Sequence, residues 1–254
     1  MSEKKISEIQ QEYKQIDTNE LPSFIAEYIN DGRPGVSKII GVAQKRMEKL
    51  RIECERIEKL KEYENNLWED YEYIGGIDEV GRGPLAGPVV AACVILPKDC
   101  SILYINDSKK LTAAKREELY DTIMKEAVSV SIGVVSEARI DEINILQATY
   151  EAMRQAISEA KVEPQVLLND AVTIPGVNIK QVPIIKGDAK SISIGAASII
   201  AKVTRDRMMV EYENIYPEYH FASNKGYGSA EHIAALKEYG PCPIHRMSFI
   251  GNFV

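Results

Sequence analysis

The feature that most constrains the fold is the alternation, from Tyr71 onward, of short apolar segments with longer amphipathic ones. Apolar runs rich in β-branched residues predict strands, and apolar residues three and four apart predict helices. The predicted strands are residues 74–80, 89–96, 128–135, 166–168 and 181–185. The predicted helices are residues 112–126, 145–161 and 191–212. Strands with helices between and after them predict an α/β fold in which helices cover a mixed sheet.

The connections indicate how the first strands pair. A Gly- and Pro-rich turn, residues 83–88, joins the first two predicted strands, and so short a connection favours antiparallel neighbours. Thr112 stands where its hydroxyl can cap the helix that follows. In the last predicted helix, Ala197 and Ala201 belong to a face of small residues that favours close packing.

Residues 1–70 show a different pattern. Apolar residues from Ile40 to Ile57 recur at intervals of three and four, among charged residues of both signs, which is typical of a long solvated helix. We therefore predict a helical N-terminal extension, residues 1–70, followed by an α/β domain, residues 71–254. The extension either packs on its own domain or forms an arm that grips a partner or nucleic acid.

Charge and cysteine content exclude several classes of protein. With 31 basic and 38 acidic residues the formal net charge is −7, which argues against coating nucleic acid or anionic membrane by bulk charge. The four cysteines form no C-x-x-C pair, and the N-terminus alternates charges where a signal peptide would be apolar. We expect a soluble, cytoplasmic monomer with reduced thiols and no membrane partner.

Two adjacent carboxylates, Asp78 and Glu79, lie within the first predicted strand. Neighbouring strand residues point to opposite faces, so one of the two side chains must face inward if the strand is regular. An unpaired carboxylate is costly to bury, and a divalent cation would offset that cost. The alternative is an edge strand that leaves both carboxylates in water.

Two further carboxylates follow later strands. Asp170 comes at the end of the fourth predicted strand, and Asp188 comes shortly after the fifth. Ligand sites in open α/β sheets lie beyond the strand ends, so these acids can converge with Asp78 and Glu79. Oxygen ligands without a Cys or His cluster suit Mg²⁺ or Mn²⁺ better than zinc.

The segment Gly81-Arg82-Gly83 follows the first two acids. Its glycines permit a tight turn, and they also let a polymer backbone approach the exposed peptide groups. Arg82 adds a forked cation suited to phosphate. The segment is not a P-loop, because no Gly-Lys-Ser/Thr follows, and no G-x-G-x-x-G helix start supports a dinucleotide site.

Five motifs together resemble the bacterial ribonuclease HII family, the type 2 ribonucleases H. They are G-I-D-E-V-G-R-G-P-L-A-G-P-V-V-A-A from Gly76, D-S-K-K-L from Asp107, A-A-S-I-I-A-K-V-T-R-D from Ala196, K-G-Y-G-S from Lys225 and H-R-M-S-F from His245. They occur in the family's order between residues 71 and 250. Residues 1–70 resemble an extension that some members carry.

The resemblance implies a ribonuclease H-like mixed five-stranded sheet with flanking helices. It implies that Asp78, Glu79, Asp170 and Asp188 are catalytic and hold two divalent ions, Mn²⁺ or Mg²⁺. The implied enzyme is an endoribonuclease that hydrolyses the RNA strand of RNA/DNA hybrids. It also incises ribonucleotide-containing DNA duplexes on the 5′ side of the ribonucleotide, as in ribonucleotide excision repair, and leaves 3′-hydroxyl and 5′-phosphate ends.

The resemblance also assigns contacts with the substrate. The Gly81-Arg82-Gly83 segment is expected to recognise the 2′-hydroxyl, by which a protein distinguishes RNA from DNA. Tyr227, between two glycines, is expected to stack on the sugar at the ribonucleotide–deoxynucleotide junction, although a loop aromatic packed on the core has the same pattern. Ser108, Lys109 and Lys110 are expected to meet phosphates.

For other residues of these motifs we predict structural roles or only weak contacts with the substrate. Asp206 lies in a predicted helix beside arginines, where an ion pair is expected, and Asp107 matches no metal-ligand position of the family. Cys242 and His245 have C-x-x-H spacing but lack two further ligands, so we expect a structural role rather than zinc binding. The weaker candidates for substrate contact are Lys202, His245 and Arg246.

Two other functions stay open at this point. Another two-metal nuclease of the same fold, such as a junction nuclease or an integrase, would account for the acids but not for G-R-G and K-G-Y-G together. A non-catalytic hybrid-binding module would require the loss of at least one metal ligand, and all four acids are present.

Overall fold

The computed structural model describes residues 4–253, and the contacts divide the chain into two compact units, Met1–Glu58 and Lys59–Val254. The division differs from the predicted boundary at residue 70. Helix α4 (Glu62–Leu67) belongs to the second unit by its contacts, although it lies within the predicted extension.

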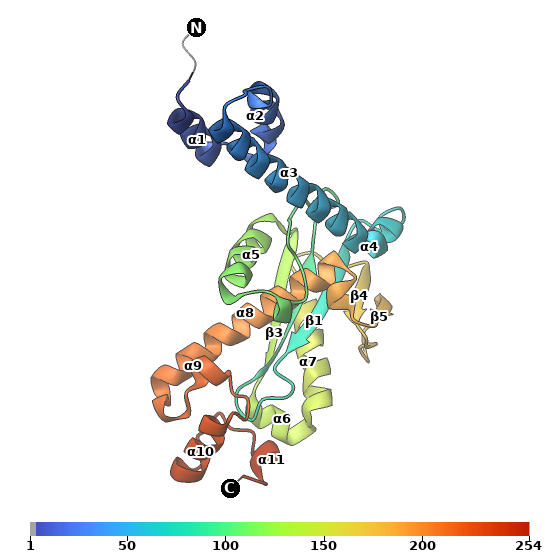
Figure 1. Ribbon diagram of the computed structural model, residues 1–254. Helices are drawn as coiled ribbons and strands as arrows, with labels where there is room; N and C mark the ends of the chain where they lie inside the picture. Colours follow the sequence, from blue (N-terminus) through green and yellow to red (C-terminus); the bar gives the residue numbers. More distant parts are fainter. Residues whose placement is uncertain (1–3, 254) are drawn as a thin grey trace. The chain divides into compact units, whose positions relative to one another are not determined.

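The first unit contains α1 (Ile6–Gln15), a 3₁₀ turn (Thr18–Glu20), α2 (Leu21–Tyr28) and most of α3 (Pro34–Leu60) (Figure 1). Ile40 and Ala43 of the predicted stripe pack with residues of α1 and α2 in a shared apolar core. Met47 and Cys54, which continue the same spacing of three and four, are exposed, so this set of apolar residues is not buried along its whole length. Other members of this core are Ile9, Leu21, Phe24, Ile25, Tyr28, Val36 and Ile39.

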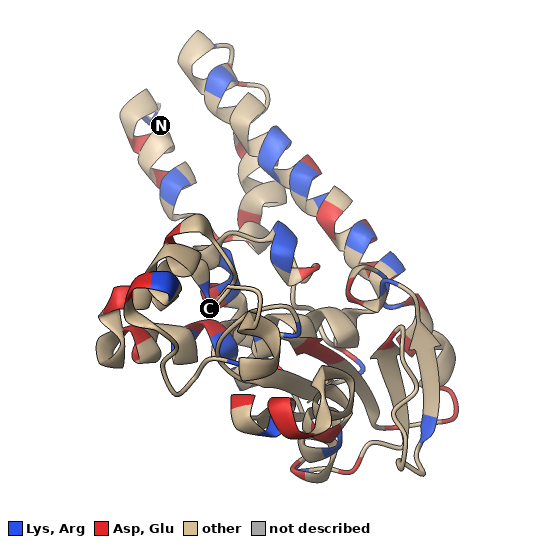
Figure 2. Ribbon diagram, turned by 90° about the horizontal axis from the view of Figure 1, so that it is seen from below, with Lys and Arg blue, Asp and Glu red and all other residues tan. Residues whose placement is uncertain are grey.

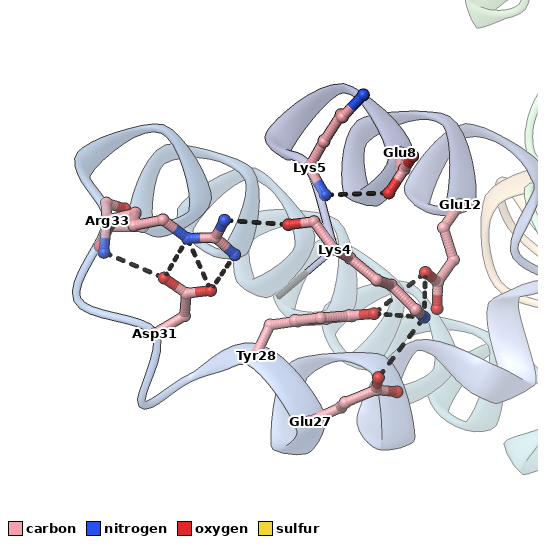
Figure 3. Close-up of polar contacts among 9 residues, drawn as sticks. Lys4, Lys5, Glu8, Glu12, Glu27, Tyr28, Asp31 and Arg33 are labelled. Atoms are coloured by element: carbon pink, nitrogen blue, oxygen red, sulfur yellow. Dashed lines mark hydrogen bonds and ion pairs between the residues drawn. The ribbon is translucent and has the colours of Figure 1, made fainter. Parts of the chain in front are cut away.

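Polar contacts also tie the first unit together (Figure 3). Arg33 donates to the carbonyl oxygen of Lys4 at 2.9 Å and pairs with Asp31 at 2.5 Å, which lowers the pKa of Asp31 to about 2. Lys4 Nζ in turn lies 2.7 Å from the hydroxyl oxygen of Tyr28 and 2.9 Å from Glu12. These contacts connect the start of α1 with the end of α2 and the start of α3.

The second unit is built on a five-stranded sheet in the order β3-β2-β1-β4-β5. The strands are β1 (Ile74–Val80), β2 (Val89–Ile95), β3 (Ser129–Val135), β4 (Val166–Asp170) and β5 (Lys180–Ile184). β1 and β2 pair antiparallel, as their short connection predicts. β3 also pairs antiparallel with β2, although residues 96–128 separate these two strands in the sequence, and β1, β4 and β5 run parallel. The mixed five-stranded sheet is confirmed. Because β1 is central, the edge-strand alternative for its two acids is wrong.

Helices cover both faces of this sheet (Figure 1). α8 (Ile192–Ile215) packs so closely on β1 that a Cβ added to Gly76 would lie 2.1 Å from the carbonyl carbon of Ser193. On the other face, α7 (Ile145–Ser158) approaches β3 so that a Cβ added to Gly133 would lie 1.9 Å from the carbonyl oxygen of Ala152. These glycines are therefore required by packing.

The other helices of this unit surround the sheet. α5 (Ala113–Glu126) packs beside α8, and the predicted cap is confirmed because Thr112 accepts the N–H of Lys115. Helices that the sequence analysis does not predict are α6 (Glu137–Ile143), α9 (Phe221–Asn224), α10 (Ala230–Tyr239) and α11 (Met247–Ile250). Short 3₁₀ turns are Ser108–Lys110, Gly187–Ala189 and Pro217–Tyr219. Within residues 4–253, no helix is long and apolar enough to cross a membrane.

Helix α4 is attached to the start of α8 by a buried carboxylate. Glu64 is fully buried and accepts hydrogen bonds from the hydroxyl of Ser191 and, at 2.9 Å, from the N–H of Ser193. Burial raises the pKa of Glu64. Leu67 and Trp68 pack on the apolar cluster formed by β1, β4, β5 and α8. α4 is therefore part of the core of the second unit.

Candidate active site

The parallel strands bring the four predicted acids to one edge of the sheet. The carboxyl ends of β1, β4 and β5 meet there because these strands run in the same direction. Asp78 and Glu79 lie near the end of β1, and Asp170 is the last residue of β4. Asp188 lies in the 3₁₀ turn that follows β5. The structure thus brings the four acids to the same edge of the sheet, and their role as metal ligands stays a prediction.

Burial and mutual repulsion make Asp78 and Glu79 difficult to ionise. The pKa of Asp78 is raised well above its ordinary value by burial, then by Glu79 and by Asp170. The pKa of Glu79 is also raised, mainly by burial, although the nearby guanidinium of Arg82 opposes the shift. A bound cation would lower these pKa values, because its positive charge favours the ionised carboxylates.

A fifth carboxylate lies close to the cluster. The pKa of Asp188 is raised by burial and then by Asp107 and Asp170, so Asp107 faces the same site. Asp107 also accepts the N–H of Lys109 at 2.9 Å and thereby starts the Ser108–Lys110 turn. Asp107 could not be assigned to this site from the sequence, because only the fold brings the loop before α5 to the ends of the parallel strands.

The donor chemistry of the cluster suits divalent metal. A set of carboxylate oxygens matches the ligand preference of Mg²⁺ and Mn²⁺. As the side chains stand in residues 4–253, no three or more Asp, Glu, His or Cys are grouped so that they could hold one ion. Glu79 pairs with Arg82 at 3.2 Å, and Asp170 accepts the Gly187 N–H at 2.7 Å. To bind an ion, Glu79 would exchange the Arg82 guanidinium for it.

A buried arginine holds the Gly81-Arg82-Gly83 loop from behind. The guanidinium of Arg246 donates to the carbonyl oxygens of Gly81 at 2.5 Å, Arg82 at 3.0 Å and Gly87 at 2.7 Å. In a trans peptide the N–H points opposite to the carbonyl. The N–H groups of Arg82 and Gly83 are therefore directed away from Arg246, as a loop that binds a ligand through its backbone requires.

A second buried arginine, Arg205 of α8, supports the remainder of the same turn. It donates to the carbonyl oxygens of Ala86 at 3.0 Å and Pro88 at 2.9 Å, and to that of Lys225 at 2.8 Å. Gly81 has a φ of +92°, and a Cβ added there would lie 2.3 Å from Arg205 Nε. Only glycine fits this position, because both the backbone conformation and the guanidinium exclude a side chain.

From the sequence, Arg205 has no predicted part in the site, and Arg246 is a weak candidate for substrate contact. Both are fully buried, so the structure makes them supports of the loop. Burial lowers the pKa of Arg205 to about 10 and that of Arg246 to about 9, values that still leave both charged at neutral pH. The burial of Arg205 could have been inferred from the sequence. Ala197, Ala201 and Met209 are buried and follow one another on α8 at multiples of four residues, and Arg205 belongs to the same series.

Tyr227 stands beside the glycine loop. Its side chain is 49% exposed, and its Cε1 lies 3.7 Å from the position of a Cβ added to Gly83. The preceding Gly226, with a φ of +83°, accepts the N–H of Leu85 at 2.8 Å and so attaches the Tyr227 loop to the turn after β1. An accessible aromatic ring therefore lies beside the glycine loop, and its predicted stacking on a sugar stays a prediction.

Ser108 and Lys109 differ in their exposure. The hydroxyl of Ser108 is buried and lies 2.9 Å from that of Ser198, which also hydrogen-bonds Asp78. Because Ser108 is buried, a role in positioning Asp78 through Ser198 suits it better than the predicted contact with phosphate. Lys109, by contrast, is exposed next to Asp107, so its side chain is accessible for the predicted phosphate contact.

Two other expectations are confirmed. Asp206 forms ion pairs with Lys202 at 2.5 Å and Arg116 at 3.9 Å, although these are not the adjacent arginines that the sequence suggests. Cys242 and His245 are both buried, with Sγ 3.1 Å from Nδ1, and pack in an aromatic cluster. Their contact is structural.

Both parts of the chain match known protein families. The family described as ribonuclease HII matches residues 75–252, and the ribonuclease HII N-terminal domain matches residues 5–68. A curated ribonuclease HII from Lachnoclostridium phytofermentans is 64% identical over 248 residues, which cover 98% of this chain and 97% of the relative.

Solved structures share the fold. Ribonuclease H2 from Pyrococcus horikoshii, 29% identical, has a TM-score of 0.59 and covers 69% of this chain and 93% of its own. A Bst ribonuclease HIII solved in complex with Mn²⁺, 16% identical, has a TM-score of 0.57 and covers 70% of this chain and 67% of its own. The ribonuclease H-like fold is therefore confirmed. With a family match over most of its length and close relatives over nearly all of it, this chain belongs to the ribonuclease HII family of hydrolytic ribonucleases H.

Proposed function

We propose that the chain is an endoribonuclease that hydrolyses the RNA strand of RNA/DNA hybrids and incises DNA duplexes on the 5′ side of an embedded ribonucleotide. One observation carries the proposal: four carboxylates converge beside a loop whose peptide N–H groups are turned away from Arg246. A non-catalytic hybrid-binding module has no support, because no member of this acid set is missing.

The proposed roles follow from the positions of the side chains. Asp78, Glu79, Asp170 and Asp188 would hold two divalent cations, Mg²⁺ or Mn²⁺, which supply water activation and charge stabilisation at phosphorus. The N–H groups of the Gly81-Arg82-Gly83 loop would contact the 2′-hydroxyl, which DNA lacks. Products would carry 3′-hydroxyl and 5′-phosphate ends.

Cleavage of a DNA duplex that contains one ribonucleotide tests this function. We expect a single cut on its 5′ side in Mg²⁺ or Mn²⁺ and no cut in EDTA. The matched controls are the all-DNA duplex and the same duplex with a 2′-O-methyl ribonucleotide, which removes the hydroxyl proton. Cutting of the all-DNA duplex at the same rate would contradict the proposal.

Tyr227→Ala should impair cutting at one embedded ribonucleotide by about tenfold, the typical cost of removing an aromatic stacking contact. The effect on long hybrids should be smaller, because they offer many alternative registers. Tyr239→Ala is the matched control, since Tyr239 is also exposed but lies on α10. Equal loss of activity on both substrates would show that Tyr227 supports the fold or general binding instead.

The first unit is proposed to add contacts with duplex phosphates. Basic and acidic residues alternate along α3, the long helix in Figure 2. Arg51 pairs with Glu48 at 2.7 Å and also with Glu55, so part of this basic charge is already compensated. Lys45 and Lys49 are exposed on the same helix.

Changing Lys45 and Lys49 together to Gln should weaken duplex binding. The slope of the logarithm of the binding constant against the logarithm of the salt concentration should also become shallower, by about 0.9 for each phosphate that the protein no longer neutralises. Arg51→Gln is the matched control and should have a smaller effect, because Arg51 is paired. Affinity measured against salt concentration decides. Unchanged affinity and slope in the double variant would exclude the proposed binding of duplex phosphates by α3.

A further inference from the structure

A chain of buried hydrogen bonds ends on the backbone of Tyr227. His232 of α10 and His245 are both buried, and their Nε2 atoms lie 2.9 Å apart. On one side, His232 Nδ1 lies 2.8 Å from the carbonyl oxygen of Tyr227. On the other side, His245 Nδ1 lies 3.0 Å from the backbone nitrogen of Cys242.

These contacts fix the proton positions in both rings. The N–H of Cys242 can only donate, so His245 Nδ1 accepts and the His245 proton is on Nε2. His245 Nε2–H must then donate to His232 Nε2, which leaves the His232 proton on Nδ1. His232 Nδ1–H therefore donates to the carbonyl of Tyr227. This arrangement of two neutral rings satisfies all three bonds.

The surroundings of the two rings favour this neutral state. The ring of Phe221 meets His232 edge-on at a centroid distance of 5.3 Å, and Tyr219 meets His245 edge-on at 4.9 Å. Burial lowers the pKa of His232 and lowers that of His245 to about 4. A proton added to either ring would also place two N–H groups opposite each other.

The backbone of Tyr227 is held on both sides. Its N–H donates to the carbonyl of Asn224 at 2.9 Å, and its carbonyl accepts from Ser229 N–H at 2.8 Å as well as from His232. The aromatic ring itself is exposed beside Gly83. The orientation of this ring therefore depends on the backbone beneath it.

We propose that His232 and His245 are positioning residues that fix the backbone of Tyr227 through their directed hydrogen bonds and so present its ring to the substrate sugar. The inference rests on the proposed sugar contact of Tyr227. His245 acts indirectly through His232, because its Nε2–H keeps the His232 proton on the nitrogen that faces Tyr227.

Two variants of His232 form a matched pair. In His232→Asn, the side-chain amide can occupy the place of Nδ1 and still donate to the Tyr227 carbonyl, whereas His232→Leu fills the site without a donor. In the full-length protein without substrate, hydrogen–deuterium exchange of residues 224–229 should rise by about fivefold in His232→Leu, the equivalent of one hydrogen bond, and less in His232→Asn. Unchanged exchange in His232→Leu would overturn the proposal, whatever Tyr227 binds.

A double-mutant cycle with Tyr227→Ala tests the link to the substrate. His232→Leu should lower single-ribonucleotide cleavage by about fivefold relative to long-hybrid cleavage, and this added loss should vanish when Tyr227 is already Ala. Equal losses on both substrates in both backgrounds would show a merely structural role and overturn the inference. If Tyr227→Ala itself spares the single-ribonucleotide substrate, the proposed sugar contact fails, while the exchange result still decides whether His232 positions the loop.

Discussion

Asp78→Asn is expected to lower hybrid cleavage by about a thousandfold and to stabilise the metal-free protein. Loss of one carboxylate from the proposed metal site should remove several kcal/mol of transition-state stabilisation, which corresponds to about a thousandfold in rate. Stability should rise because Asp78 is buried beside Glu79 and Asp170, where its charge is unfavourable without a cation. Single-turnover rates and urea unfolding in EDTA measure the two effects.

The gain in stability should depend on pH. Because its folded-state pKa is raised, Asp78 keeps its proton to higher pH in the folded protein than in the unfolded chain. The parental metal-free protein therefore loses stability as the pH rises above the ordinary carboxyl pKa of about 3.9, and the Asn variant lacks this loss. The difference in unfolding free energy should grow toward neutral pH. A variant that is less stable than the parent at neutral pH in EDTA would contradict this account.

Asp206→Asn is the matched control for Asp78→Asn. Asp206 is a half-buried acid that pairs with Lys202 and Arg116 on the α5–α8 side of the unit. Its removal should reduce stability, because it leaves two cations without their partner, and should change the cleavage rate far less. A thousandfold loss of rate in this control would mean that the rate does not report on the metal site.

Deleting residues 1–70 is expected to destabilise the second unit severely, whereas a chain that begins at Lys59 should fold. The longer deletion removes Glu64, which accepts the buried N–H of Ser193, and an unsatisfied buried donor costs about 1–3 kcal/mol. It also removes Leu67 and Trp68, which are partly buried against the apolar cluster, and partial burial of such large side chains contributes about 1 kcal/mol or more each. The sum is a large part of the roughly 5–15 kcal/mol by which domains are stable.

Urea unfolding of the two truncated proteins measures this difference. Glu64→Gln in the full-length chain is the control for the carboxylate alone, because Gln keeps an oxygen that can accept from Ser193 while losing the charge. Glu64→Gln should lower the free energy of unfolding much less than the longer deletion does. Equal stability of the two truncated proteins would show that α4 contributes little, and the boundary at residue 70 would then serve as well as the one at Glu58.

The sheet and the acids could be predicted because both depend on local patterns that the fold preserves. Strands such as β1 and β2 are apolar runs between Gly- and Pro-rich turns, and their pairing follows from a short connection. The convergence of Asp170 with Asp78 follows from a general property of parallel strands, whose carboxyl ends share one edge. These inferences need no knowledge of distant contacts.

The missed features depend on contacts between distant segments. Arg246 lies 165 residues from Gly81, to which it donates, and nothing in its local sequence indicates burial. Asp107 reaches the acid cluster only through the fold of a long loop. α9 and α11 are four-residue helices, too short to show a periodicity. The division by contacts differs from the predicted boundary because α4 continues the charged pattern of α3, although its buried Glu64 belongs to the second unit.

The two arginines beneath the glycine loop should also affect how the enzyme responds to ionic strength. Arg205 and Arg246 bring two positive charges under the loop in a chain whose net charge is −7, and both bond to backbone carbonyls rather than to carboxylates. Dissolved ions screen exposed charges over about 8 Å at physiological ionic strength, but they cannot surround a buried guanidinium. Attraction of a phosphate to this loop should therefore persist at salt concentrations that abolish attraction to exposed lysines, so that added salt releases the flanking duplex before it releases the ribonucleotide.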